Sequence, residues 1–189
     1  MAIQEQTITA ERFLELVEQP EYADRVLELV EGELVEMSKP TRKHGVITMR
    51  LAMMIANHVA ANELGEVPAA ETGFVLERNQ YGRDTVRGVD IAFVSKERVP
   101  DELDNTWYET GPDLAAEVIS PNNKASDIHL KVTQLLNAGA RLIWVIYPES
   151  RSVVVHTANG ATTLHENDTL SGGDLLPGFE LRVGDIFPS

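Results

Sequence analysis

The sequence predicts a mixed α/β fold in which at least two strands run parallel. Two nearly continuous apolar segments, residues 114–119 and 142–147, have the length and composition of strands that are covered on both faces. A helix is predicted between them, and a strand–helix–strand unit of this spacing makes a right-handed crossover. The whole order reads as helix, β-hairpin, helix, three strands, helix, strand and a short β tail. With 189 residues, 43% of them hydrophobic, we expect one domain over residues 1–189.

The N-terminal half alternates between helical and strand patterns. Thr9 can cap a short amphipathic helix, and the Glu-Gly pair at residues 31–32 marks the turn of a hairpin over residues 25–37. Apolar residues then recur at a spacing close to 3.6 over residues 44–62, which predicts a second helix. Two strands and a loop with at most one helical turn follow, at residues 71–77, 88–94 and 95–110 respectively.

The C-terminal half contains the crossover unit and the β tail. Ser126 is expected to cap the crossover helix, and Gly139 suits the left-handed residue after its end. The Asn-Gly pair at residues 159–160 predicts a hairpin over residues 153–165. No repeat or low-complexity segment interrupts the chain, so no second domain is expected.

The net charge restricts the classes of function. At −14 it argues against a broad basic surface, because proteins bind phosphates through Lys and Arg. A carboxylate site that holds a divalent cation would reverse the local field, so a nuclease stays possible. Five basic residues could line one groove, or could equally be ordinary surface charges: Arg42, Lys43, Arg50, Arg83 and Arg87.

The sequence lacks cysteine and long apolar segments, and this limits both its cellular location and the kinds of metal site that it can form. With no cysteine, the chain has neither a disulfide framework nor a thiolate metal site. The first six residues have neither the basic start nor the apolar run of a signal peptide, and no apolar segment is long enough to cross a bilayer. We therefore expect a cytoplasmic protein without a membrane partner.

Two acidic residues stand within apolar strand patterns, Asp90 and Glu117. A carboxylate in such a place costs several kcal/mol of desolvation unless it is paired, hydrogen-bonded or bound to metal. If the two strands are neighbours, both carboxylates can converge on one hard cation, with positions left for water and a phosphate oxygen. Either residue alone could instead lie in water at a strand end or pair with Arg87 or Lys131, but together they favour a shared site.

The crossover helix carries an acid and a lysine four residues apart, Asp127 and Lys131. An ordinary helix-stabilising pair accounts for Asp127. Lys131 could also stabilise the charge that develops when water attacks a phosphate. Glu28 and Glu33 in the hairpin could add a carboxylate to the site, although a solvated hairpin face explains both. The spacing of His129, His156 and His165 suits no metal site, and the sequence has no phosphate-binding glycine loop or nucleophile elbow.

Seven features, spread over about residues 10–187, also occur together in a known family. They are residues 31–37 (EGELVEM), His44, residues 89–94 (VDIAFV), residues 112–121 (PDLAAEVISP), Lys131, Gly139 and Trp144. In this order and spacing they resemble the Uma-type restriction endonucleases, a group of unknown function in the PD-(D/E)XK nuclease superfamily. Because several blocks match at once, the resemblance is quite specific.

The resemblance implies a restriction-endonuclease-like αβββαβ core with a mixed sheet, an N-terminal helix and β-hairpin, and a C-terminal β extension. It implies an endonuclease that uses Mg²⁺ or Mn²⁺ to hydrolyse phosphodiester bonds of DNA. Asp90 and Glu117 match the superfamily's metal-binding acids, and the backbone carbonyl of Val118 matches a further ligand. Lys131 matches a lysine of the Uma-type pattern, and His44 matches a position that would contact phosphate or activate water. A lone histidine at the start of a helix is, however, more often a cap or a packing residue.

The sequence departs from the superfamily pattern at a catalytic position. The lysine expected two residues after the second acid is Ile119, and Lys131 could return an ammonium group to the same space. Val89 replaces a proline and Leu135 an aromatic residue, at positions that are not ligands. The missing lysine and the net charge leave two alternatives: an inactive nuclease-like module for binding or dimerisation, or an acidic oligomeric scaffold. A homodimer is expected in any case, because strand-rich extensions leave edges to cover.

Overall fold

The computed structural model describes residues 7–188; the first six residues, on which the expected lack of a signal peptide rests, lie outside this range. Its elements confirm the mixed α/β class. The helices are α1 (Ala10–Val17), α2 (Arg42–Ala61), α3 (Ala125–Asn137) and a short 3₁₀ helix, η1 (Val183–Ile186). The strands are β1 (Leu27–Val30), β2 (Glu33–Glu36), β3 (Gly65–Glu66), β4 (Phe74–Glu77), β5 (Thr85–Arg87), β6 (Ile91–Ser95), β7 (Leu114–Val118), β8 (Leu142–Tyr147), β9 (Ser152–Thr157), β10 (Gly160–Leu164), β11 (Thr169–Ser171) and β12 (Glu180–Arg182).

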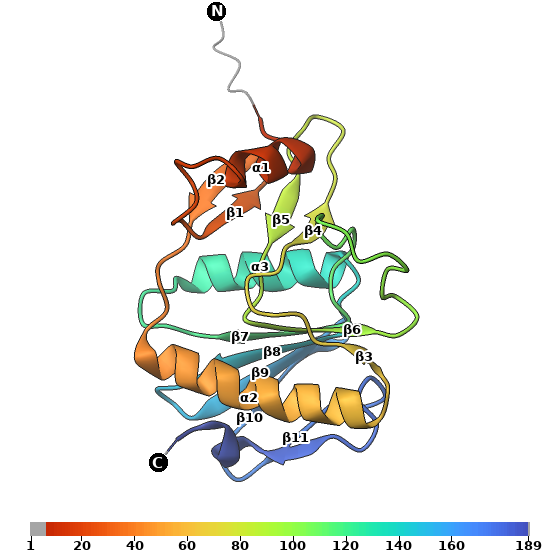
Figure 1. Cartoon of the computed structure of the whole chain (residues 1–189). Coiled ribbons are helices and arrows are strands. Elements are labelled where there is room, and N and C mark those ends of the chain that lie inside the picture. Colours follow the sequence, from red (N-terminus) through yellow and green to blue (C-terminus); the bar gives the residue numbers. More distant parts are fainter. Residues whose placement is uncertain (1–6, 189) are drawn as a thin grey trace, which may run out of the picture.

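The central sheet has six strands in the order β10-β9-β8-β7-β6-β3. Strands β7 and β8 are parallel and joined through α3, as predicted, and their neighbours are antiparallel. Helix α2 covers one face of this sheet and α3 the other (Figure 1). Side chains alternate between the faces: Ala116 of β7 packs in the cluster with α2, whereas Ala115 packs in the cluster with α3.

A second sheet, β2-β1-β5-β4, lies on the far side of α3. On one face it packs against α1, where Phe13 meets Leu29 and Val86. On the other face Phe74 and Leu76 of β4 join the core around α3. Figure 1 therefore shows layers in the order α1, four-stranded sheet, α3, six-stranded sheet and α2. Helix α3 is the layer that both sheets share.

The strand predicted at residues 88–94 begins only at Ile91, as β6, and a strand that was not predicted, β5, precedes it in the other sheet. Strand β5 ends at Arg87 in the four-stranded sheet, and β6 begins at Ile91 in the six-stranded sheet. Asp90 therefore stands immediately before a strand and not inside one. The prediction was wrong here because the apolar pattern runs on across a bend that only the docking of two sheets produces.

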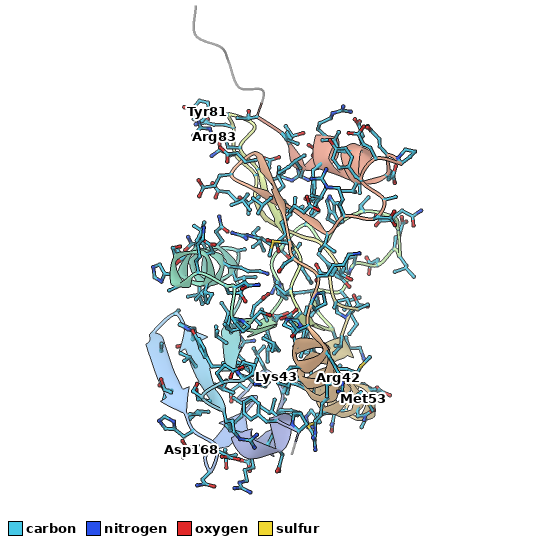
Figure 2. The ribbon with its side chains drawn as sticks, turned by 90° about the vertical axis from the view of Figure 1, so that its left-hand side faces the viewer. Arg42, Lys43, Met53, Tyr81, Arg83 and Asp168 are labelled. Atoms are coloured by element: carbon cyan, nitrogen blue, oxygen red, sulfur yellow. The ribbon has the colours of Figure 1, made fainter. Side chains whose placement is uncertain are left out.

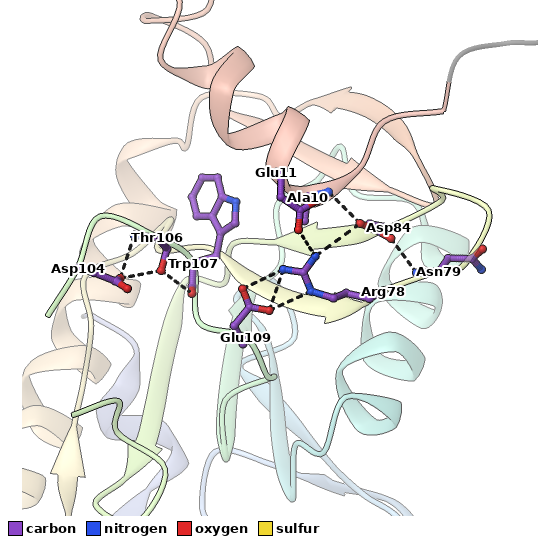
Figure 3. A network of polar contacts seen from close by, with 9 residues as sticks. All are labelled: Ala10, Glu11, Arg78, Asn79, Asp84, Asp104, Thr106, Trp107 and Glu109. Carbon is purple, nitrogen blue, oxygen red and sulfur yellow. Dashed lines mark hydrogen bonds and ion pairs between the residues drawn. The ribbon is translucent and has the colours of Figure 1, made fainter. Parts of the chain in front are cut away.

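The first helix is fixed to the four-stranded sheet by buried and exposed polar contacts (Figure 3). The backbone N–H of Ala10 donates to Asp84 Oδ2 over 2.9 Å, at the N-terminus of α1. The Arg78 guanidinium makes a bidentate pair with Glu109, with N···O distances between 2.8 and 3.0 Å, and also contacts Glu11. These contacts hold the N-terminal helix, the β4–β5 turn and the loop near residue 109 together.

The ends of the helices show which capping predictions hold. Thr9 Oγ1 accepts from Arg12 N over 3.3 Å, so the predicted cap of α1 is confirmed. Helix α3 begins two residues earlier than expected, with Lys124 at the N-cap and no side-chain cap. Ser126 lies inside the first turn and donates to Asp127 Oδ1, so it is not the cap. Gly139 has φ +96°, as its predicted role requires.

The C-terminal segment forms the expected β extension. Strands β9 and β10 make the predicted hairpin and complete one edge of the six-stranded sheet. Strands β11 and β12 form a separate pair, and apolar residues from this region, including Leu176 and Ile186, close the core beneath α2. None of the helices within residues 7–188 combines the length and hydropathy needed to cross a bilayer.

Candidate active site

The pairing of β6 with β7 brings Asp90 and Glu117 together. Ile91 is paired with Ala116 in antiparallel register, so the residue before Ile91 stands opposite the residue after Ala116. Asp90 Oδ2 also accepts a hydrogen bond from Val118 N over 2.7 Å. Because side chains alternate along β7, Glu117 points to the same side as Ala115, toward α3.

The two acids line a pocket of about 120 Å³ to which both sheets contribute. The six-stranded sheet supplies Asp90 and Glu117, whereas the hairpin and β5 supply residues from the other sheet. The first turn of α2 and the middle of α3 close the sides. The ionisable residues of the lining are Glu28, His44, Glu71, Arg87, Asp90, Glu117, Asp127 and Lys131.

Lys131 points from α3 into this pocket, between two carboxylates. Its Nζ atom lies 2.8 Å from Glu117 Oε1 and 3.2 Å from Glu28 Oε1, and its side chain is 13% exposed. Burial alone would lower the pKa of Lys131, but the charges of Glu117 and Glu28 raise it above the ordinary value. Lys131 is therefore an ammonium throughout the physiological range. Asp127 is exposed and contacts Ser126, so the simple i,i+4 ion pair expected on this helix is not formed.

Glu117 is destabilised as a carboxylate. Burial, followed by the charges of Asp90 and Glu28, raises its pKa to about 7, although Lys131 acts in the opposite direction. Its Oε1 atom is inaccessible to water, and the ammonium of Lys131, 2.8 Å away, compensates its charge. Any further positive charge placed beside Glu117 would stabilise its ionised form.

His44 reaches the site from the first turn of α2. Thr41 caps this helix by accepting from His44 N, and His44 Nε2 lies 3.0 Å from Asp90 Oδ2. Because an ionised carboxylate only accepts, Nε2 carries the proton in this contact. The hydrogen bond to Asp90 raises the pKa of His44 above its ordinary value. The histidine therefore holds the Asp90 carboxylate in a fixed orientation.

Glu28 and Arg87 are site residues that were predicted to be exposed to solvent, and this prediction was wrong. Glu28 was expected on a solvated hairpin face, and Arg87 in a groove or on the surface. They are only 2% and 5% exposed, and Arg87 Nη1 donates to Glu28 Oε2 over 2.8 Å. The signal was present, since Glu28 lies between two leucines of a strand, the argument already applied to Asp90. Glu33, by contrast, is exposed as expected.

Glu71 is a further acid at the pocket rim, and sequence reasoning missed it. It has φ +67°, which places the residue in the left-handed region. A Cβ on Gly88 would lie 3.1 Å from Glu71 Oε2, so the close approach of this carboxylate needs the glycine. Partial burial raises the pKa of Glu71, and the charges of Asp90 and Glu28 act in the same direction. No local pattern marked this residue.

The five basic residues do not form one groove. Figure 2 shows Arg83 at one end of the molecule, while Arg42 and Lys43 lie on α2 near the other. Arg87 is buried, and Lys43 pairs with Glu149 over 2.7 Å. Arg42 and Arg50 remain exposed on α2, a helix of 20 residues that contains no acidic side chain. This helix is thus a basic element in an acidic chain.

The shifted pKa values predict a pH dependence of stability. A raised pKa in the folded state stabilises the fold below the ordinary pKa, and this contribution is lost as the pH rises through the shifted value. For Glu117 the window runs from 4.5 to about 7. Across this window, urea unfolding of the metal-free protein should show the wild type losing stability relative to Glu117→Gln. Two curves that stay parallel between these pH values would contradict the shift.

The donor set of the pocket suits a hard divalent cation. No group of three or more His, Asp or Glu side chains within residues 7–188 is arranged as a metal site. The chemistry nevertheless fits, because five carboxylates line a partly closed space together with two permanent cations and one histidine. The carboxylates are Glu28, Glu71, Asp90, Glu117 and Asp127; the permanent cations are Arg87 and Lys131. The backbone N–H of Val118 donates to Asp90. That the carbonyl of Val118 is a metal ligand stays a prediction.

Comparison with known proteins identifies the family and the fold. A family model described as "Uma2: Putative restriction endonuclease" matches residues 10–184. The chain belongs to this family. The crystal structure of a putative nuclease belonging to DUF820 from Anabaena variabilis superposes with a TM-score of 0.80 at 19% identity, covering 95% of this chain and 97% of that one. No curated protein matches the sequence. The family indicates a nuclease, and the structural likeness establishes the fold.

Proposed function

We propose that this Uma2-family protein is an endonuclease that uses Mg²⁺ or Mn²⁺ to hydrolyse phosphodiester bonds of DNA. The observation that carries the proposal is the meeting of Asp90 and Glu117 across β6 and β7, with the Lys131 ammonium 2.8 Å from Glu117. Two acids and a cationic group at one point of a sheet are the parts that metal-assisted phosphoryl hydrolysis needs.

The cation would be held by the carboxylates of Asp90 and Glu117 and by the carbonyl of Val118. When bound, it supplies Lewis-acid polarisation of the phosphate and a more acidic water molecule. The protein's own contribution is to keep these ligands in place. Asp90 is fixed by Val118 N and by His44, at 2.7 and 3.0 Å, so one of its oxygens is committed and the other is left for the cation.

Lys131 is the group that meets the phosphate. Its ammonium can donate to a non-bridging oxygen and stabilise the negative charge that develops as water adds and the sugar oxygen leaves. The superfamily lysine would stand two residues after Glu117, where this chain has Ile119. An ammonium that reaches Glu117 from α3 supplies the same charge from the neighbouring layer of the fold.

Helix α2 is the surface along which we place the substrate backbone. The segment that leads into α2 lines the pocket through Met37, Ser38 and Pro40, and the exposed Arg42 follows directly. Arg42 and Arg50 can neutralise phosphates on one strand of DNA, and α2 carries no acid to oppose them. A cytoplasmic location and a homodimer remain part of this proposal, because both were expected from the sequence.

The direct test is a cleavage assay with the wild-type protein. Supercoiled plasmid, double- and single-stranded oligonucleotides and RNA are each incubated with Mg²⁺, Mn²⁺ or EDTA. We expect DNA cleavage with either cation and none in EDTA. Absence of cleavage on every substrate, together with no heat of cation binding in calorimetry, would overturn the proposal.

The alternative function is an inactive nuclease-like module for binding or dimerisation. Two observations favour it: Ile119 replaces the superfamily lysine, and both acids already have partners, Lys131 and His44. It predicts DNA binding or dimer formation without cleavage under any cation. The same assay, combined with a gel-shift titration and sedimentation, separates the two functions.

A further inference from the structure

Glu28 belongs to the four-stranded sheet, yet its carboxylate enters the site built on the six-stranded sheet. Its Oε1 atom lies 3.2 Å from Lys131 Nζ, and its other oxygen accepts from Arg87 Nη1 over 2.8 Å. At 2% exposure it has almost no contact with water. Both carboxylate oxygens are therefore committed to cations from two different elements.

Arg87 ties this carboxylate to the helix that carries Lys131. The guanidinium donates from Nε and Nη2 to Gln134 Oε1, over 3.0 and 2.8 Å. Gln134 stands one helical turn after Lys131 on α3, and it is also buried. These contacts form a closed ring: Glu28 contacts Arg87, Arg87 contacts Gln134 on α3, and Lys131 on the same helix contacts Glu28. The ring fixes where Glu28 can lie relative to the helix.

Lys131 has two carboxylate partners with different duties. Glu117 is a proposed cation ligand, so positive charge bound there weakens its hold on the ammonium. Glu28 has no such second duty, since Arg87 already occupies its other oxygen. We propose that Glu28 is the positioning residue that keeps Lys131 directed at the phosphate once Glu117 holds a cation. This inference rests on the proposed function, and it gives the N-terminal hairpin a part in the reaction.

The test compares Glu28→Gln with Glu33→Gln, a matched change at an exposed position of the same hairpin. A misplaced catalytic group costs about 100-fold in rate, so Glu28→Gln should lower kcat by about that factor with little change in KM. Glu33→Gln should behave as the wild type. In a Lys131→Met background the additional loss from Glu28→Gln should vanish, because nothing is left to position. A loss that persists there, or an unchanged kcat, overturns the inference.

A second readout does not need catalysis. The chain has five lysines, and mass spectrometry after limited acetylation in Mg²⁺ reports each of them separately. Lys131 should be labelled several-fold faster in Glu28→Gln than in the wild type, relative to Lys39, Lys43, Lys96 and Lys124. Equal labelling overturns the inference. If the wild type cleaves nothing, the proposed function fails, whereas the labelling result still decides whether Glu28 holds Lys131.

A conservative variant covers the case in which Glu28→Gln does not fold. Glu28→Asp keeps the charge that Arg87 requires but shortens the side chain by one methylene, which withdraws it from Lys131. Folding of each variant is checked by circular dichroism. Glu28→Asp should show the same rise in Lys131 labelling and a smaller fall in kcat. Wild-type labelling in a folded Glu28→Asp protein overturns the inference.

Discussion

Glu117→Gln should abolish cation-dependent cleavage, with kcat lower by about 1,000-fold or more. The amide has nearly the same shape as the carboxylate but lacks the charge that holds a divalent cation. The change should also remove the heat of Mg²⁺ binding in calorimetry, since half of the proposed acidic pair is lost. Asp90→Asn should give the same result, because Asp90 supplies the other half.

The matched control is Glu180→Gln, an exposed glutamate on β12 in the separate two-stranded sheet. It should cleave and bind cations as the wild type does. Cleavage by Glu117→Gln at more than about a tenth of the wild-type rate would show that the cation is held elsewhere. Measured across several cations, this comparison tests the proposed ligand and the proposed chemistry together.

Arg87→Met should lower the free energy of unfolding by about 3–5 kcal/mol, the range found when a buried ion pair loses one partner. The variant leaves the Glu28 carboxylate buried with only Lys131 at 3.2 Å, and it leaves Gln134 Oε1 without its donor. Urea unfolding followed by circular dichroism measures the change. The variant should retain its fold at low denaturant, since methionine fills a similar apolar volume.

Two further variants decide whether buried charge is the cause. Arg83→Met changes an exposed arginine near the same sheet and should shift stability by no more than about 0.5 kcal/mol. Adding Glu28→Gln to Arg87→Met should recover part of the loss, because it removes the uncompensated charge. A double variant that is less stable than Arg87→Met would contradict this explanation.

The parts of the site that could be predicted are those whose signals are local. Glu117 stands out because an acid interrupts an apolar strand, and its position on β7 follows from the alternation of side chains. Asp90 has the same signal, although the structure places it just before β6. Lys131 required the family resemblance, since its spacing to Asp127 is equally typical of an ordinary surface pair.

The remaining parts depend on contacts between distant segments. Glu28 is an acid between two leucines of a strand, which is a local signal, but its partners Lys131 on α3 and Arg87 lie far along the chain and could not be named from the hairpin pattern. The end of β5 at Arg87 is likewise set by which sheet each strand joins. Glu71 reaches the pocket through a left-handed backbone and the open space above Gly88, and neither leaves a periodic pattern in the sequence.

The short passage from β5 to β6 has a consequence for how the protein matures. Only residues 88–90 separate the end of β5 in one sheet from the start of β6 in the other, and Asp90 is one of the three. The pocket is complete only after both sheets have docked on α3. This docking joins residues that lie far apart in the sequence, such as Glu28 and Lys131. A nascent or partly unfolded chain therefore lacks the assembled pocket, so the proposed cleavage requires the fully folded molecule.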